Sequence, residues 1–176
     1  MEPFWENIFR KDRKEKSTEA ALRQNVLFQD LNASEISWVQ KIVNVRSYAP
    51  GETIFQQGEI GVGMYIVVRG GVDIVTEEAP PGNEKTLSQI VTRLTDGDFF
   101  GEIALVEETS RRTATARCEE ETVLIGFFKP DLMEIVSRKP AAGVKILLRL
   151  SQILGGRLSE TTKLIRHLRH QIGNAK

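Results

Sequence analysis

Short β-forming stretches separated by turns that contain glycine fill the middle of the chain, between residues 52 and 128. The stretches with the composition of strands are residues 53–55, 64–68, 72–75, 86–94, 112–117 and 122–128. Turn sequences between them include Gly70-Gly71 and Asp96-Gly97-Asp98. Many short strands at roughly even spacing are typical of an antiparallel barrel or jelly roll. We therefore predict an antiparallel β-roll, a double-stranded jelly roll, as the centre of the fold.

Helical patterns precede this region and make the predicted fold class α+β. Asn32 and Glu35 have the spacing of a capping box, and Leu31 and Ile36 have the spacing of a hydrophobic staple. Residues 1–24 are rich in charge and are expected to be helical. Their start carries a short apolar stripe of Phe4, Trp5, Ile8 and Phe9. This stripe could contact a membrane surface or a partner, or it could pack back on its own domain.

A long helix is predicted after the strands, with Pro140 in its first turn. Residues at alternating steps of four and three form a heptad pattern along it: Leu147, Ser151, Leu154, Leu158, Thr161, Ile165, Leu168 and Ile172. Gly155-Gly156 weakens this helix locally. The apolar face could pack on its own roll or on the same helix of a second chain. We favour a homodimer, because the pattern runs past what a small roll could cover.

Three regions follow from these patterns: an N-terminal helical extension at 1–24, the β-roll at 25–138, and a C-terminal dimerisation or lid helix at 139–176. The 24 basic and 24 acidic residues give no net charge, which argues against a surface built as a whole to bind nucleic acid. One cysteine, Cys118, excludes an intrachain disulfide and favours a reducing compartment. Without a membrane-spanning run or a secretion signal, the cytoplasm is the expected location.

Enzymatic chemistry is not expected from this composition. The only histidines, His167 and His170, lie near the end of the long helix with no metal ligands near them in sequence. No phosphate-binding loop of the GxxxxGK[ST] type is present, and no acid–base pair or activated nucleophile is evident. We therefore predict a binding protein with no metal and no cofactor.

The most informative segment is residues 99–105, FFGEIAL, followed by Arg111, Arg112 and TAT. Gly101 allows the backbone to approach a ligand closely, and a short helix beginning near Glu102 would offer backbone N–H groups to an anion. An arginine from the neighbouring strand would complete that anion site. Glu102 could accept a hydrogen bond from a sugar hydroxyl. Together with an apolar wall, these groups suit a phosphorylated sugar that carries a flat base.

FGEIAL followed by RTAT resembles the phosphate-binding cassette of the cyclic nucleotide-binding domains, and the spaced glycines agree with that family. The resemblance implies that Glu102 accepts from the ribose 2′-hydroxyl and that the backbone at Gly101, Ile103 and Ala104 holds the cyclic phosphate. It further implies that Arg112 binds the phosphate, with Thr113 as the adjoining hydroxyl and Arg111 as a more exposed neighbour.

The C-terminal helix also resembles the dimerisation helix of catabolite activator-like members of the family. Arg157 would then lie near the ligand, and Thr161 and Thr162 would contact the base, one pair from each subunit. Both threonines could equally be ordinary residues of a helix surface. Ile74, Val91 and Thr92 match positions that line the purine pocket in the family, although apolar strand residues are also common in a core.

The resemblance implies a stand-alone cyclic nucleotide sensor that signals to a partner protein by moving its C-terminal helix. Thr161 and Thr162 favour cAMP, whereas Thr113 is compatible with a guanine amino group, and we favour cAMP over cGMP. No helix-turn-helix segment follows Leu168, so direct DNA binding by that route is not expected. The alternative is a scaffold domain that retains the cassette but binds no nucleotide, with Glu102 paired to Arg112.

Overall fold

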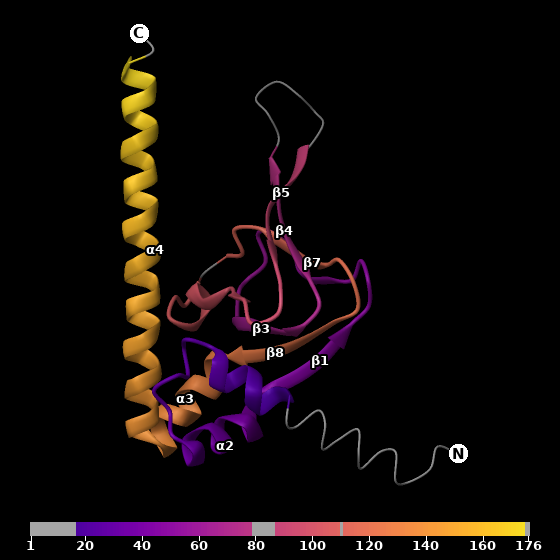
Figure 1. Ribbon diagram of the computed structural model, residues 1–176, viewed down its shortest axis with the longest axis vertical. Coiled ribbons are helices and arrows are strands. Elements are labelled where there is room, and N and C mark those ends of the chain that lie inside the picture. Colours follow the sequence, from indigo (N-terminus) through magenta and orange to yellow (C-terminus); the bar gives the residue numbers. More distant parts are fainter. Residues whose placement is uncertain (1–16, 79–86, 110, 175–176) are drawn as a thin grey trace, which may run out of the picture.

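Two four-stranded antiparallel sheets form a roll, and helices pack at one end of it, as the computed structural model shows for residues 17–78, 87–109 and 111–174 (Figure 1). The first sheet has the order β1-β8-β3-β6 and the second the order β2-β7-β4-β5. The strands are β1 (Asn44–Tyr48), β2 (Thr53–Phe55), β3 (Gly63–Arg69), β4 (Val72–Glu78), β5 (Leu87–Leu94), β6 (Phe99–Phe100), β7 (Thr115–Cys118) and β8 (Thr122–Phe128). The predicted antiparallel roll and α+β class are confirmed.

One strand begins later than its sequence pattern indicates. The strand expected at 112–117 starts at Thr115, because Arg111 and Arg112 pair with the loop after β2 instead. The backbone N–H of Arg112 donates to the carbonyl of Glu59, and its carbonyl accepts from the N–H of Gly58, each at 2.8 Å. These bonds hold Arg112 beside the loop that leads into β3, and this position decides where its side chain lies.

The helices before the roll have the capping that the sequence predicts. Residues 17–24 are helical, and α2 (Ala33–Ile42) begins at Asn32 with both capping-box bonds present, at 3.0 and 2.8 Å. Ile36 and Val39 of α2 are buried. The apolar stripe expected at Phe4, Trp5, Ile8 and Phe9, with its membrane or partner contact, lies outside the described residues.

The core divides into two apolar clusters. One lies inside the roll, and its buried members are Tyr48, Val67, Val72, Phe100, Ala116, Cys118 and Leu124. The other joins the N-terminal helices to β3, β8 and the two C-terminal helices, and in it the Phe28 and Phe127 rings meet edge to face at 5.4 Å. Burial raises the pKa of the Cys118 thiol. The helices therefore share one core with β3 and β8 of the first sheet. The second sheet packs on the cluster inside the roll.

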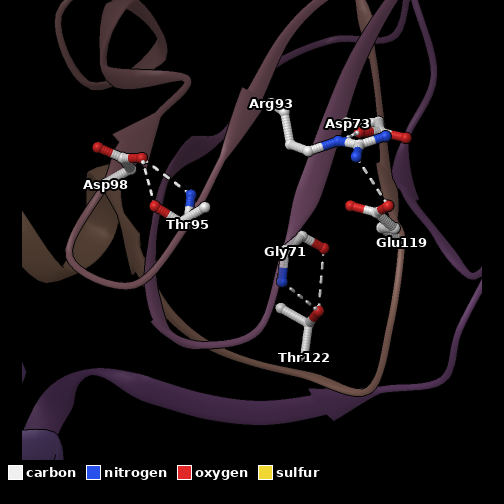
Figure 2. A network of polar contacts seen from close by, with 7 residues as sticks. All are labelled: Gly71, Asp73, Arg93, Thr95, Asp98, Glu119 and Thr122. Carbon is white, nitrogen blue, oxygen red and sulfur yellow. Dashed lines mark hydrogen bonds and ion pairs between the residues drawn. The ribbon is translucent and has the colours of Figure 1, made fainter.

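Polar contacts fix the ends of the second sheet (Figure 2). Arg93 of β5 donates to Asp73 of β4 at 2.8 Å and pairs with Glu119 at 2.9 Å. The buried hydroxyl of Thr122 accepts from the N–H of Gly71 at 3.2 Å and lies 3.1 Å from its carbonyl. These bonds tie the β3–β4 turn to the segment between β7 and β8, and so hold the two sheets together at this edge.

The C-terminal helix α4 (Pro140–Asn174) follows α3 (Lys129–Arg138) and stands beside the roll, with its second half extending past the first sheet (Figure 1). Lys145 and Arg149 pair with Glu35 and Asp30 at 2.7 and 2.5 Å, and Ile146 and Leu150 are fully buried. Beyond Gly156 the apolar side chains of the heptad pattern are exposed. Of the first members of the pattern, Leu154 packs against this chain's own core, whereas Leu147 and Ser151 are exposed. The helix therefore packs on the core through residues beside the heptad pattern, such as Ile146 and Leu150. None of the helices in the described part of the chain has the length and apolarity to cross a bilayer.

Candidate functional site

The segment that the sequence singled out forms a tight turn and a single helical turn after β6. Gly101 has φ +80°, a left-handed conformation, and η1 (Glu102–Leu105) follows as a 3-10 helix. A Cβ at Gly101 would meet Nη1 of Arg112 at 2.4 Å. Glycine is therefore required here both for the backbone conformation and for the close approach of the arginine. The predicted short helix is present, in its tighter 3-10 form.

Arg112 is buried, with 8% of its surface exposed, and lies against this turn. Its Nη2 donates to the carbonyl of Gly63 at 2.8 Å, and its Nη1 lies 3.4 Å from the carbonyl of Gly101. Its Nε is buried and has no partner. Burial lowers the pKa of Arg112, and neighbouring Tyr65, Glu59 and Glu102 only partly offset that effect. The site thus holds a desolvated cation that retains a free N–H.

Glu102 is also buried, and its carboxylate pairs with Arg157 of α4. The Arg157 guanidinium also lies 5.2 Å from the centre of the Phe99 ring. The scaffold alternative expects Glu102 to pair with Arg112, and the structure is different. The glutamate pairs with Arg157 of the C-terminal helix instead. The Nε of Arg112 therefore has no hydrogen-bond partner.

A cavity of about 330 Å³ lies between the cassette, the second sheet and Arg157. The cavity lining includes most of the predicted site residues: Gly101, Glu102, Ile103, Ala104, Arg112, Thr113, Ile74, Thr92 and Arg157. Arg111 also lies at this cavity and donates to the carbonyl of Gly58 at 2.7 Å, and it is exposed as expected. The cassette and the arginines therefore give the cavity charged and hydrogen-bonding groups. The strand residues that line it are largely apolar.

The other predicted base contacts do not meet this cavity. Val91 is 60% exposed and outside the lining. It lies where the β4–β5 register shifts, since Ile74 pairs with Thr92 and Val75 with Ile90, which leaves Val91 as the unpaired residue of a bulge. Thr161 and Thr162 are exposed on α4, where each hydroxyl donates to the carbonyl four residues earlier at 2.8 Å. They lie beyond Arg157, on the part of α4 that extends past the cassette.

Comparison with known proteins agrees with this geometry. Residues 45–139, more than half of the chain, match the family described as the cyclic nucleotide-binding domain. The chain belongs to this family. The matched residues contain β1 except Asn44, all of β2 to β8 and α3, and so contain both the cassette and Arg112.

Relatives of this cyclic nucleotide-binding domain are proteins of several kinds. The Cyclic AMP receptor protein of Thermus thermophilus is 30% identical over 139 residues, which are 79% of this chain and 60% of that protein. The cAMP-dependent protein kinase regulatory subunit of Mycosarcoma maydis is 28% identical over 77% of this chain and 23% of its own length. The chain thus spans less than two thirds of either relative. The crystal structure of the Thermus thermophilus Catabolite Activator Protein superposes with a TM-score of 0.71 and 26% identity, covering 82% of this chain and 63% of that one.

Several aromatic residues of the site could not be assigned from the sequence. Phe55, Phe99 and Phe100 line the cavity together with Leu94, and in the sequence they have only the character of strand residues. The Arg112 guanidinium lies 4.0 Å from the centre of the Phe55 ring. Buried arginines often pack on aromatic rings, so an aromatic neighbour of Arg112 could be expected. The sequence does not show which ring that is.

The arrangement is suited to binding. The lining of the cavity includes neither histidine nor cysteine among its described residues, and the described residues contain no cluster of metal-ligating side chains. Arg112 and the glycine-lined turn can hold an anion, Glu102 can accept from a hydroxyl, and the apolar strand residues can cover a flat ring.

Proposed function

We propose that the cavity binds a cyclic nucleotide, with Arg112 on the cyclic phosphate and Glu102 on the ribose 2′-hydroxyl. The backbone at Gly101, Ile103 and Ala104 would complete the phosphate contacts, and Thr113 would add a hydroxyl. The observation that carries this proposal is the buried guanidinium of Arg112, which lines the cavity and whose Nε has no hydrogen-bond partner. A buried polar group without a partner is costly, and an anionic ligand would satisfy it with a charge-assisted hydrogen bond.

cAMP is the proposed ligand in preference to cGMP. Two relatives are named for cAMP, the receptor protein and the kinase regulatory subunit. Thr113 lies at the cavity, where its hydroxyl is also compatible with a guanine amino group. The choice of base therefore needs direct measurement with both nucleotides.

The proposed role is that of a regulatory module that acts through α4. Arg157 forms an ion pair with the carboxylate of Glu102, the group that would accept a hydrogen bond from the ribose. A bound ribose would compete with Arg157 or share Glu102 with it, and either outcome alters how α4 is held at the cassette. A ligand shifts such an equilibrium only by its differential affinity for the two arrangements. The changed surface of α4 would then be offered to a partner protein.

Homodimerisation through α4 is part of the proposal. The side chains of Leu158, Ile165, Leu168 and Ile172 are 46 to 69% exposed at heptad spacing. A second copy of α4 would bury this stripe, as in a coiled coil.

Calorimetric titration of cAMP and cGMP into the wild type, Arg112→Ala and Arg111→Ala tests the binding site. Loss of the buried cation should cost about 1.5–3 kcal/mol, or about tenfold to more than a hundredfold in affinity. Arg111→Ala tests the other arginine of the cavity, which is exposed and bonded to a backbone carbonyl. Arg69→Ala is the control, because Arg69 is exposed and lies outside the cavity lining. Equal affinity in wild type and Arg112→Ala would remove the phosphate assignment.

The scaffold alternative remains as a second candidate, because Glu102 already has a partner in Arg157. Thermal melting with and without millimolar nucleotide separates the two candidates. Binding to the native state must raise the melting midpoint, whereas a scaffold that binds no nucleotide would melt at the same temperature in both solutions.

A further inference from the structure

The Arg112 guanidinium depends on very few contacts for its orientation. Two backbone carbonyls, of Gly63 and Gly101, accept from its Nη atoms. A Cβ at Gly61 would lie 3.3 Å from its Nε and Cζ, so the backbone passes close to the guanidinium at that point as well. Among the described residues, no carboxylate forms an ion pair with Arg112, since Glu102 pairs with Arg157. Its orientation must therefore come from these carbonyls and from the surfaces it packs on.

Phe55 supplies the closest aromatic surface. The Arg112 Cζ lies 4.0 Å from the centre of the Phe55 ring, well inside the range of a cation–π contact, and 6.0 Å from that of Tyr65. A planar guanidinium stacks on such a ring while its edge stays available for hydrogen bonds. Because Arg112 is desolvated, the contact belongs to the stronger part of the cation–π range.

The Phe55 ring is itself held in place. Its centre lies 5.9 Å from the Tyr65 ring and 5.8 Å from the Phe100 ring, and those two rings stack on each other at 5.5 Å. Phe55 is also the last residue of β2 and pairs with β7. The ring is thus a fixed surface, held by residues of both sheets, against one face of a guanidinium whose edge is hydrogen-bonded to two carbonyls.

We propose that Phe55 is the positioning residue for Arg112: its ring fixes the plane of the guanidinium in the orientation in which Arg112 lines the cavity, and so presents it to an anionic ligand. The orientation is a property of the free protein, and its consequence for affinity rests on the proposed nucleotide site. Phe55 lines the cavity as well, so a direct contact with the ligand is the competing explanation.

A double-mutant cycle separates the two explanations. Dissociation constants for cAMP are measured by NMR titration in the wild type, Phe55→Leu, Arg112→Ala and the double variant. If the ring acts through Arg112, Phe55→Leu weakens binding by about tenfold in the wild-type background and by less than about twofold in the Arg112→Ala background. Phe55→Tyr keeps the ring and should restore affinity to within about twofold of the wild type. An equal loss in both backgrounds would show direct ligand contact and overturn the proposal.

The free protein gives an independent readout, which decides the matter even if no nucleotide binds. The Nε–Hε resonance of Arg112 should be shifted by the ring current of Phe55 and exchange slowly with water. Phe55→Leu should remove the shift and speed the exchange, whereas Phe55→Tyr should keep both. If Phe55→Leu does not fold, Phe55→Met, which retains an apolar side chain without a ring, replaces it in the same measurements. An unchanged Nε–Hε resonance in a folded ringless variant would refute the positioning role.

Discussion

Gly101→Ala and Gly97→Ala form a matched pair that tests how the cassette is built. Both glycines have a left-handed backbone, with φ +80° and +89°, so alanine should cost each about 1–2 kcal/mol in backbone strain. They differ in surroundings. A Cβ at Gly97 meets nothing within 4 Å, whereas a Cβ at Gly101 meets the Arg112 Nη1 at 2.4 Å.

The extra cost at Gly101 comes from displacing the guanidinium. In solvent the end of an arginine would move at little cost, but this one is buried and hydrogen-bonded to Gly63. Losing a hydrogen bond of a charged group costs about 1.5–3 kcal/mol, so Gly101→Ala should lower the free energy of unfolding by about 2.5–5 kcal/mol in total. Gly97→Ala should lower it by the strain alone.

Urea unfolding gives the two stabilities, and titration with cAMP gives the two affinities. Gly101→Ala should lose at least about tenfold in affinity because Arg112 is displaced, and Gly97→Ala should bind as the wild type does. Equal losses of stability in the two variants would refute the close contact between Gly101 and Arg112. Equal stabilities with unequal affinities would point to an effect on the ligand alone.

Other consequences can be measured separately. A Cβ at Gly155 or Gly156 would meet nothing within 4 Å, and alanine favours the helix over glycine. Gly155→Ala and Gly156→Ala should therefore each stabilise α4 by up to about 1 kcal/mol and slow amide exchange in residues 157–172. Leu158→Glu together with Ile165→Glu should yield a monomer by light scattering if the exposed stripe is a dimer interface. The ion pairs of Asp30 with Arg149 and of Glu35 with Lys145 lower the pKa of both carboxyls. Their stabilisation is therefore complete above the unfolded pKa values, and it is lost as pH falls below about 4.5 for Glu35 and about 3.8 for Asp30. The free energy of unfolding of Asp30→Asn and of Glu35→Gln, measured against pH, should therefore be lower than that of the wild type at neutral pH and approach it in acid.

Features determined by neighbouring residues could be predicted from the sequence. The capping box of Asn32 and Glu35 needs only a spacing of three residues, and the roll follows from turns whose glycines adopt left-handed conformations, as Gly70 and Gly97 do. The cassette was identifiable for the same reason, because FGEIAL is continuous in sequence.

Features that depend on distant partners could not be predicted. Arg157 and Glu102 are 55 residues apart, and neither residue type indicates the other as its partner. The late start of β7 depends on backbone bonds from Arg112 to the loop at Gly58 and Glu59, which compete successfully with the strand pattern. Likewise Phe55 lies in a segment with an ordinary strand pattern, and only the three-dimensional structure shows that its ring packs against the Arg112 guanidinium.

The attachment of α4 differs along its length, and this difference bears on how a ligand could be sensed. Up to Leu154 the helix is fixed by buried side chains and by two ion pairs to the N-terminal helical region. After Gly155-Gly156, an ion pair between Arg157 and Glu102 joins the helix to the cassette. The side chain of Glu102 is 2% exposed and that of Arg157 is 50% exposed, so breaking the pair leaves the glutamate, and not the arginine, as a buried charge without a partner. A ribose hydroxyl that donates to Glu102 would replace that partner, and Arg157 would then be released to solvent or to the phosphate of the ligand. A bound nucleotide would therefore change how the second half of α4 is held at the cassette.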